Sequence, residues 1–212
     1  MMDKIDRAKK EILSVISGSE VEEDLRHAKN TLEWLLKIKP DADHALQISA
    51  LGHDIERAIT ERKVRRFDVD DYDEFKKEHA KNSSKILREI LNESQISETI
   101  IDETCRLVIV HEVGGEIRSN LLKDVDSISY FDVNLPLYFE REGWEESKRR
   151  CVWGYQRLSK KMRSLVLIIR YKNPLLGRLL RESVQEAEGN QIHHSIAKSV
   201  SSVDSKPATY GH

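Results

Sequence analysis

The 212-residue sequence predicts an all-α fold, and three observations support this class. Apolar residues recur every three or four positions along most of the chain, which is the spacing of one face of an α-helix, and no segment shows convincing strand alternation. Charged residues make up 34% of the chain and aromatic residues only 6%, which suits a helix-rich protein better than a β-sandwich. Four prolines and nine glycines leave few breaks between helices.

The helical spacing predicts three helices in the first part of the chain, over residues 3–17, 20–38 and about 42–59. Gly18-Ser19 separates the first two helices, and either Asp41 or Asp43 can cap the third. Residues 61–73, which are dense in charges of both signs, are expected to form a loop.

Further helices are expected over about 74–92, from Ser94 or Ser97 to about 113, over 117–139, 144–171 and 174–189. Pro136 should disturb the end of the helix over 117–139. The helix over 144–171 carries a heptad-like apolar seam, made by Cys151, Tyr155, Leu158, Met162, Leu165 and Ile169. This seam packs either on its own domain or against a second copy, which leaves a homodimer open.

The domain organisation follows from these elements. We expect one helical domain over residues 1–189, with its core over about 20–135 and a long C-terminal helical extension over 143–189. Gly189 should end the last helix, and the polar residues 190–212 are expected to form a mobile tail.

Composition excludes several classes of protein. The net charge of −2 argues against a general nucleic-acid binder, and no apolar run reaches the roughly 18 to 20 residues that span a bilayer. The amphipathic N-terminus lacks the apolar core of a signal peptide. Cys105 and Cys151 both lie in helical patterns and are expected to be buried free thiols. We therefore expect a cytoplasmic protein without a membrane partner.

Four histidines, His27, His53, His79 and His111, each fall within a different predicted helix. One such histidine is usually a hydrogen-bonded core or surface residue, but four on successive helices, with Asp54 beside His53, indicate a metal site. Imidazole and carboxylate ligands suit Mn, Fe, Co, Ni or Zn. Adjacent residues on a helix diverge by about 100°, so one member of the His53-Asp54 pair could bind a first metal while the other faces a second.

A further carboxylate is expected from LLKDVDSIS, which contains Asp124 and Asp126. Because one residue separates them, both cannot point the same way on one helix. One is therefore expected to be a metal ligand, and the other a cap or a surface charge.

The order of these residues resembles a known pattern. His27, His53-Asp54, His79, His111 and Asp126 follow the H…HD…H…H…D pattern of the HD superfamily of metal-dependent phosphohydrolases, over about residues 20–135. EHAKNSSKIL and VIVHE are similar to its third and fourth motifs, and LLKDVDSIS to its "DAD-R-L" segment, whose second Asp is the ligand and matches Asp126. The chain departs from the pattern at Ser127, where Arg is usual, and at Glu112, where a second His is usual.

The resemblance implies an HD-domain helical bundle around one or two divalent transition metals. The simplest site of the family would use His27, His53, Asp54 and Asp126. The residues matching the two extra histidines, His79 and His111, would add a second metal, with Asp54 as the bridge that also orients the attacking water.

Other residues are candidates for catalysis and substrate binding. Glu56, three residues after His53, shares its helical face and could act as a general base, although a solvated surface Glu is the simpler reading. Cations near the motifs could hold a phosphate, or could simply be solvated. These are Arg57, Lys63, Arg65, Arg66, Lys81 and Arg118.

The function expected from this resemblance is hydrolysis of a phosphoester or phosphoanhydride in a nucleotide or another small phosphorylated metabolite. Two alternatives remain at this point. The resemblance also admits a di-iron oxygenase with the same six ligands, since ligand type alone does not fix the metal. The second alternative is a non-catalytic nucleotide-sensing module. The charged loop at 61–73 and the long C-terminal helix would suit binding of a partner by such a module.

Overall fold

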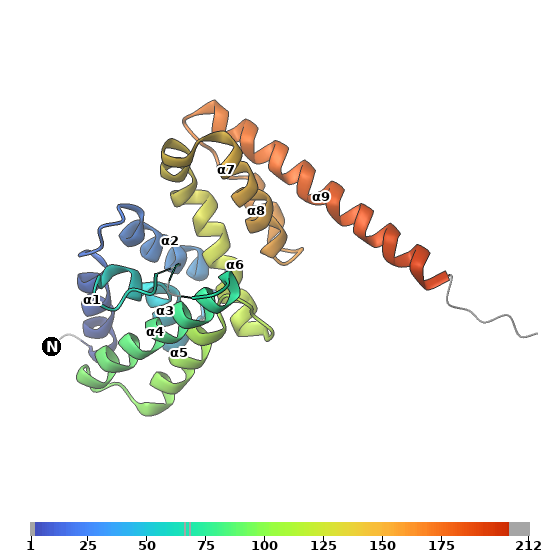
Figure 1. Cartoon of the computed structure of the whole chain (residues 1–212). Helices are drawn as coiled ribbons and strands as arrows, with labels where there is room; N and C mark the ends of the chain where they lie inside the picture. The colour runs from blue at the N-terminus through green and yellow to red at the C-terminus, as the bar shows by residue number, and fades with distance from the viewer. Residues whose placement is uncertain (1–2, 66, 68, 204–212) are drawn as a thin grey trace, which may run out of the picture.

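Every regular element in the described part of the chain is helical, which confirms the all-α prediction (Figure 1). The computed structural model describes residues 3–65, 67 and 69–203, with side chains through residue 189. The elements are α1 (Lys4–Ile16), α2 (Glu23–Ile38), α3 (His44–Gly52), η1 (Ile55–Ala58), α4 (Tyr72–Glu93), α5 (Glu98–Val110), α6 (Ile117–Ser129), η3 (Tyr130–Asn134), α7 (Leu135–Arg157), α8 (Arg163–Leu167) and α9 (Pro174–Val203).

The helices divide into a lower body and an upper layer (Figure 1). Helices α1 to α6 make the body, α7 rises out of it, and α9 packs along α7 before extending away. One apolar cluster joins α1, α3, α4 and α5, and a second joins α2 and α6 to the C-terminal helices. The second cluster fixes the position of α7 against α2 and α6.

Several predicted helices have the expected bounds and caps. The apolar face of α1 is buried as predicted, through Ile5, Ala8, Ile12 and Ile16. Of the two candidate caps for α3, Asp43 is the one used, because its carboxylate accepts from Leu46 N at 3.0 Å. Such a side-chain acceptor satisfies one of the free N–H groups at a helix start.

The helix predicted over 42–59 is interrupted at the His53-Asp54 pair. Helix α3 ends at Gly52, and Asp54 has φ −105° and ψ 13°, which lies outside the helical region. Gly52 packs so closely on α4 that a Cβ atom there would lie 2.6 Å from Leu87 Cδ2. The pair therefore occupies a tight turn between α3 and η1, not a helix interior.

The disturbance predicted near Pro136 takes the form of an irregular turn. Helix α6 ends earlier, at Ser129, and a π-helical turn, η3, leads into α7. Pro136 lies in the first turn of α7, and because it has no N–H it cannot continue the regular main-chain hydrogen bonds of the helical residues before it.

The prediction of one long helix over 144–171 is wrong, because α7 ends at Arg157. The turn after it is held by Asp124, which accepts from Ser159 N at 2.8 Å and from Ser159 Oγ at 2.6 Å. The first four seam residues are buried in the chain's own core, and Leu165 and Ile169 pack against it. The seam thus serves intramolecular packing, and a homodimer stays a prediction.

Helix α9 continues through Gly189 to Val203, so the predicted stop at Gly189 is wrong. Glycine without a positive φ lowers helix propensity but does not by itself end a helix. Of the predicted tail, residues 190–203 are helical and residues 204–212 lie outside the described residues. Within the described chain, no helix combines the length and apolar character needed to cross a membrane.

Candidate metal centre

His53 and His111 each stand immediately after the last residue of a helix, α3 and α5 respectively. His53 Nδ1 lies 3.1 Å from Ala50 O, and His111 Nδ1 lies 2.7 Å from Val108 O. The last carbonyls of a helix lack the regular N–H partner four residues on, and they can accept such side-chain bonds. With Nδ1 donating to a carbonyl, the lone pair of each neutral ring is on Nε2.

The other two histidines lie within helices and are oriented by side chains. On α2, His27 Nδ1 lies 3.0 Å from Ser129 Oγ, whose hydroxyl donates to His27 O at 3.2 Å. On α4, His79 Nδ1 donates to Glu56 Oε1 at 2.7 Å. All four rings therefore engage Nδ1 and direct Nε2 elsewhere, the arrangement in which a second shell orients metal-binding imidazoles.

A first group of donor atoms meets at His27, His53 and Asp126, all buried. His27 Nε2 lies 3.3 Å from His53 Nε2 and 3.2 Å from Asp126 Oδ1. His53 Nε2 lies 3.5 Å from the same oxygen. Donor atoms that share a metal at about 2.1 Å are about 3.0 to 3.4 Å apart, so this group has the spacing of a ligand set.

A second group gathers around Asp54 Oδ1. This oxygen lies 2.9 Å from His79 Nε2, 3.6 Å from His53 Nε2 and 3.8 Å from His111 Nε2. His53 therefore belongs to both groups. The structure brings all six predicted ligands together, and His53-Asp54 lies at the junction.

The chemistry of the cluster fits a metal. His111 Nε2 is buried without a hydrogen-bond partner. A buried polar atom left unpaired costs about 1–3 kcal/mol, which a coordinate bond would recover. Neutral imidazoles and two carboxylates are the donors that divalent transition metals take at neutral pH. The residues thus fit one ion at His27, His53 and Asp126, and a second at His53, Asp54 and His111. His79 adjoins the second group through its 2.9 Å contact with Asp54 Oδ1.

The carboxylates and imidazoles of the cluster shift one another's pKa values. Burial would lower the pKa of His53 and His79, but the neighbouring carboxylates raise them to about 8 and about 10. Burial raises the pKa of Asp54 and Asp126, but nearby cations and imidazoles bring both well below the usual range. His111 has no close carboxylate bond, and burial lowers its pKa to about 4. Protons therefore compete with metal mainly at His53 and His79.

Glu56 does not have the geometry expected of a general base. Its side chain is 1% exposed, and Oε1 accepts from His79 Nδ1 while Oε2 accepts from Val64 N at 2.8 Å. Both oxygens are engaged, on the side of His79 opposite Nε2. The geometry favours Glu56 as a positioning residue for His79, and the catalytic role expected from the sequence stays a prediction.

Arg157 is a residue of the site that sequence reasoning missed. It comes from the last turn of α7, and its Nη1 lies 2.6 Å from Asp126 Oδ2 and 3.2 Å from Ser127 Oγ. Its Nη2 lies 3.1 Å from Glu112 Oε2. At the two positions where the chain departs from the expected pattern, Glu112 and Ser127, the side chains thus both contact this arginine.

Asp124 has the structural role left open for the Asp of LLKDVDSIS that is not a candidate ligand. It is 1% exposed, so it is a buried anchor of the turn after α7, not a surface charge. By fixing Ser159, it also fixes Arg157 two residues earlier.

Residues 1–177 match the family model described as "Domain of unknown function (DUF4202)". The chain belongs to this family. No curated protein and no solved structure matches the chain.

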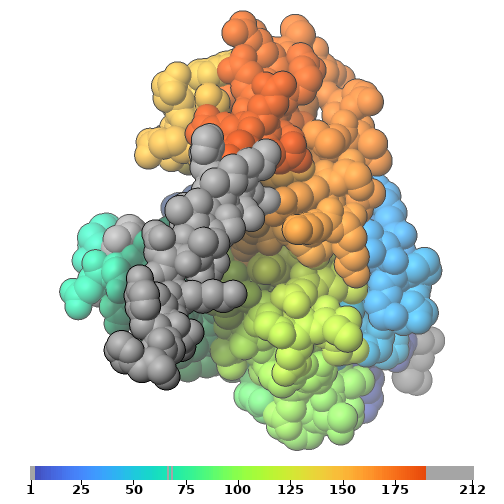
Figure 2. Space-filling model, turned by 90° about the vertical axis from the view of Figure 1, so that its right-hand side faces the viewer, coloured from blue at the N-terminus to red at the C-terminus, as the bar shows by residue number. Residues whose placement is uncertain are grey.

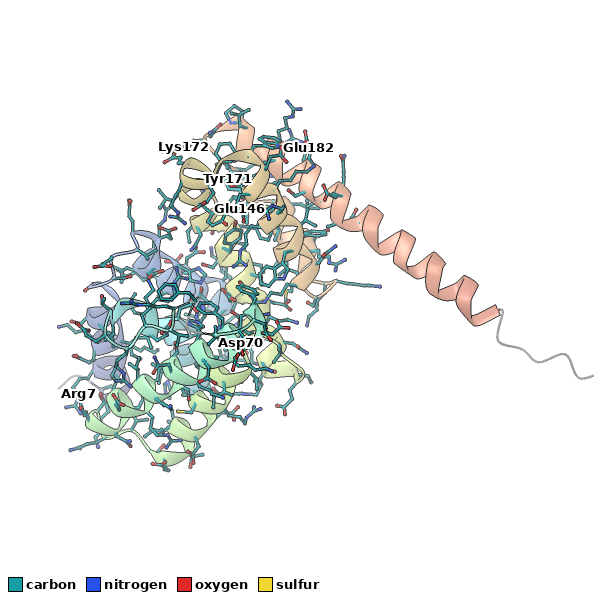
Figure 3. The ribbon with its side chains drawn as sticks, viewed as in Figure 1. Arg7, Asp70, Glu146, Tyr171, Lys172 and Glu182 are labelled. Atoms are coloured by element: carbon teal, nitrogen blue, oxygen red, sulfur yellow. The ribbon has the colours of Figure 1, made fainter. Side chains whose placement is uncertain are left out.

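In this DUF4202 member the cluster of candidate metal ligands opens into a cavity of about 770 Å³. Its walls come from the body and from α7, and Figure 3 labels Glu146, one of the residues of α7 that line it. The segment before α4 and the first part of α7 lie on the same side of the molecule (Figure 2). The cationic lining residues are Arg57, Lys63, Lys76, Arg141, Arg149, Arg150 and Arg157.

Of the five predicted phosphate-binding cations that lie within the described residues, Arg57 and Lys63 line this cavity. Arg57 is held between Asp24 and Asp54, at 3.0 and 3.2 Å. The guanidinium carbon of Arg65 lies 5.9 Å from the centroid of the Phe67 ring, and Arg65 does not line the cavity. Arg66 lies outside the described residues.

The predictions for Lys81 and Arg118 do not agree with the structure. Lys81 pairs with Glu78 at 2.6 Å on an exposed face of α4. Arg118 binds Asp43 at 2.7 Å and Glu103 at 2.8 Å. Neither lines the cavity, because closeness in sequence to a ligand does not bring a residue on another helical face to the site.

Proposed function

We propose that this DUF4202 chain is an HD-type metal-dependent phosphohydrolase that acts on a small phosphorylated metabolite such as a nucleotide. The observation that carries the proposal is the convergence of six ligand candidates, from α2, α4, α6 and the ends of α3 and α5, at the base of a cavity lined by cations. The same order of ligands in the sequence supports the HD assignment.

The protein's own residues would each have a defined part in this reaction. His27, His53 and Asp126 would hold one metal, and His79, His111 and Asp54 a second. When bound, such metals polarise phosphoryl oxygens and lower the pKa of a water to near neutrality. Asp54 Oδ1 contacts both His79 and His53, so this carboxylate lies where it can orient a nucleophile between the two groups.

The charge of the cavity favours an anionic substrate. Seven cationic and six acidic side chains line it, and two of the acids, Asp54 and Asp126, are ligand candidates. Divalent ions would make the cavity strongly positive, and a concave, partly dehydrated site concentrates such a field. A phosphate group meets this requirement with several acceptor oxygens for the arginine and lysine donors.

Aromatic side chains in the same cavity suit a substrate with an organic part of some size. They are Tyr72, Phe75, Tyr130, Tyr138 and Trp153. Rings beside charged groups can pack on the sugar or base of a nucleotide, while the cations hold its phosphate.

The proposal is tested by a screen of phosphorylated metabolites with protein loaded with Mn²⁺, Co²⁺, Fe²⁺, Ni²⁺ or Zn²⁺ in turn. Release of inorganic phosphate, lost in Asp54→Ala and retained in the surface control Asp102→Ala, is the expected result. Oxygen uptake by the Fe²⁺ form without phosphate release would overturn the hydrolase in favour of an oxygenase. Metal and nucleotide binding without turnover of any compound would favour a sensing module.

A further inference from the structure

Arg150 differs from the other arginines of the cavity in its partners. Arg57, Arg141, Arg149 and Arg157 are each joined to at least one carboxylate. Within the described part of the chain, no carboxylate lies within ion-pairing distance of Arg150, although it lines the same cavity. Its charge is therefore not neutralised by the protein.

Two aromatic rings fix the guanidinium of Arg150 instead. Its guanidinium carbon lies 4.3 Å from the centroid of the Trp153 ring and 5.3 Å from that of Tyr130. Contact with ring faces restrains an arginine while leaving its in-plane N–H donors free. Arg150 is half-buried, so these donors are partly removed from water. An ordered and unpaired guanidinium in a cavity is a ready receptor for an anion.

Arg150 is separated from the metal centre by one ring. Arg157, which binds the ligand candidate Asp126, lies 5.4 Å from the centroid of Trp153, the same ring that Arg150 contacts. Lys76 of α4 lies 5.9 Å from this centroid on the opposite wall. Its Nζ also pairs with Asp73 at 2.9 Å, an acid that is largely exposed and therefore a weak competitor.

We propose that Arg150, assisted by Lys76, binds a second anionic group of the substrate while the scissile phosphate lies at the metal centre. This inference rests on the proposed function and narrows its substrate class to compounds with two anionic groups, such as a bisphosphate or a phosphate ester that carries a carboxylate. A neutral alcohol phosphate would leave Arg150 unpaired in the complex. The spacing through one tryptophan ring suits anionic groups on different atoms of a small carbon skeleton.

The test uses the metal-loaded full chain and two probes that cannot be hydrolysed, propylphosphonate and propane-1,3-bisphosphonate. They differ only in the second anionic group. Calorimetry is expected to give a Kd about 10- to 100-fold lower for the bisphosphonate, the usual gain from charge-assisted hydrogen bonds. In Arg150→Gln this ratio should fall to about threefold or less, with the Kd of propylphosphonate unchanged.

Lys148→Gln is the matched control, because Lys148 is on the same helix and pairs with Glu186 of α9, away from the cavity. It should leave both Kd values unchanged. Equal affinity of the wild-type protein for the two probes would overturn the inference and leave the proposed function standing. Equal weakening of both probes in a folded Arg150→Gln protein would also overturn it, since the residue would then serve the first phosphate. Failure of both probes to bind would overturn the proposed function and the inference together.

Discussion

Arg157 Nη1 lies 2.6 Å from Asp126 Oδ2, while Oδ1 of the same carboxylate lies 3.2 Å from His27 Nε2. The end of α7 thus holds one oxygen of Asp126, and the other faces the histidines. Both partners of this ion pair are nearly buried, with side chains 10% and 12% exposed. The upper layer of the molecule therefore helps to hold a candidate metal ligand of the lower body.

Replacing Arg157 by Gln should weaken metal binding. The change leaves Asp126 buried without its cation, which costs about 3–5 kcal/mol of stability in the metal-free protein. Loss of a partner that orients a ligand usually lowers metal affinity about 10- to 100-fold. Competition with a chelating dye measures the affinity, and thermal unfolding measures the stability. Arg88→Gln, which breaks an exposed pair with Glu98, serves as control and should change neither quantity appreciably.

Replacing Glu56 by Ala tests whether it positions His79 or acts as a base. A positioning role predicts a metal affinity about 10- to 100-fold lower at the second group, with turnover restored in part by excess metal. In Glu56→Gln an amide oxygen can still accept from His79 Nδ1, but the amide NH2 would face Val64 N, so this variant should lose less affinity than Glu56→Ala. Normal metal binding by Glu56→Gln with complete loss of turnover would instead show that Glu56 is the general base.

Gly143 and Gly189 offer a matched pair on the C-terminal helices. A Cβ atom at either position meets nothing within 4 Å, so only backbone conformation distinguishes them. Gly143 has φ 77° and ψ −171°, a region accessible almost only to glycine, and Gly143→Ala should cost about 1–3 kcal/mol. Gly189 is helical, so Gly189→Ala should leave stability unchanged or raise it by up to about 1 kcal/mol. Denaturant unfolding measures both, and destabilisation of the same size in the two variants would contradict the account.

The protonation of His53 and His79 predicts opposite pH trends with and without metal. Their pKa values, about 8 and about 10, are raised above the unfolded value of 6.5. This contribution to stability is fully present below pH 6.5 and is lost as the pH rises through 8 and 10. The Tm of the metal-free protein should therefore fall between pH 7 and about pH 10, while the rise in Tm on adding metal grows, because metal displaces these protons.

The pH trend has a specific control. His79→Gln removes the more strongly raised pKa, so its metal-free Tm should fall less steeply above pH 8 than that of the wild-type protein. Parallel curves for the two proteins would show that His79 is not protonated in the metal-free state.

The ligands of the site could be predicted from sequence, but their local geometry could not. The order of His27, His53-Asp54, His79, His111 and Asp126 was sufficient because it resembles a known pattern of ligands on successive helices. Periodicity does not show that α3 and α5 end beside His53 and His111, since the apolar pattern continues past both helix ends. The imidazoles themselves bond the last carbonyls there, and that is a tertiary feature of the site.

That α7 forms a wall of the cavity could not be predicted from the sequence, for a different reason. The apolar residues of this helix, such as Cys151 and Tyr155, form a clear seam, and core packing was a sufficient explanation of the helix. The opposite face carries Arg150, Trp153 and Arg157, spaced by three and four residues, and this was the available signal. Whether such a basic face meets solvent or a cavity depends on where the helix packs, which only the structure decides.

Metal content measures the central claim, that these six side chains form a metal centre, most directly. Protein purified without added metal, then loaded with Mn²⁺, Fe²⁺ or Zn²⁺ and desalted, should retain one to two ions per chain by elemental analysis. His53 contributes to both donor groups, so His53→Ala should lose most of this metal while keeping its helical circular dichroism. A wild-type protein that retains no ion, or a His53→Ala protein that retains as much as wild type, would contradict the account.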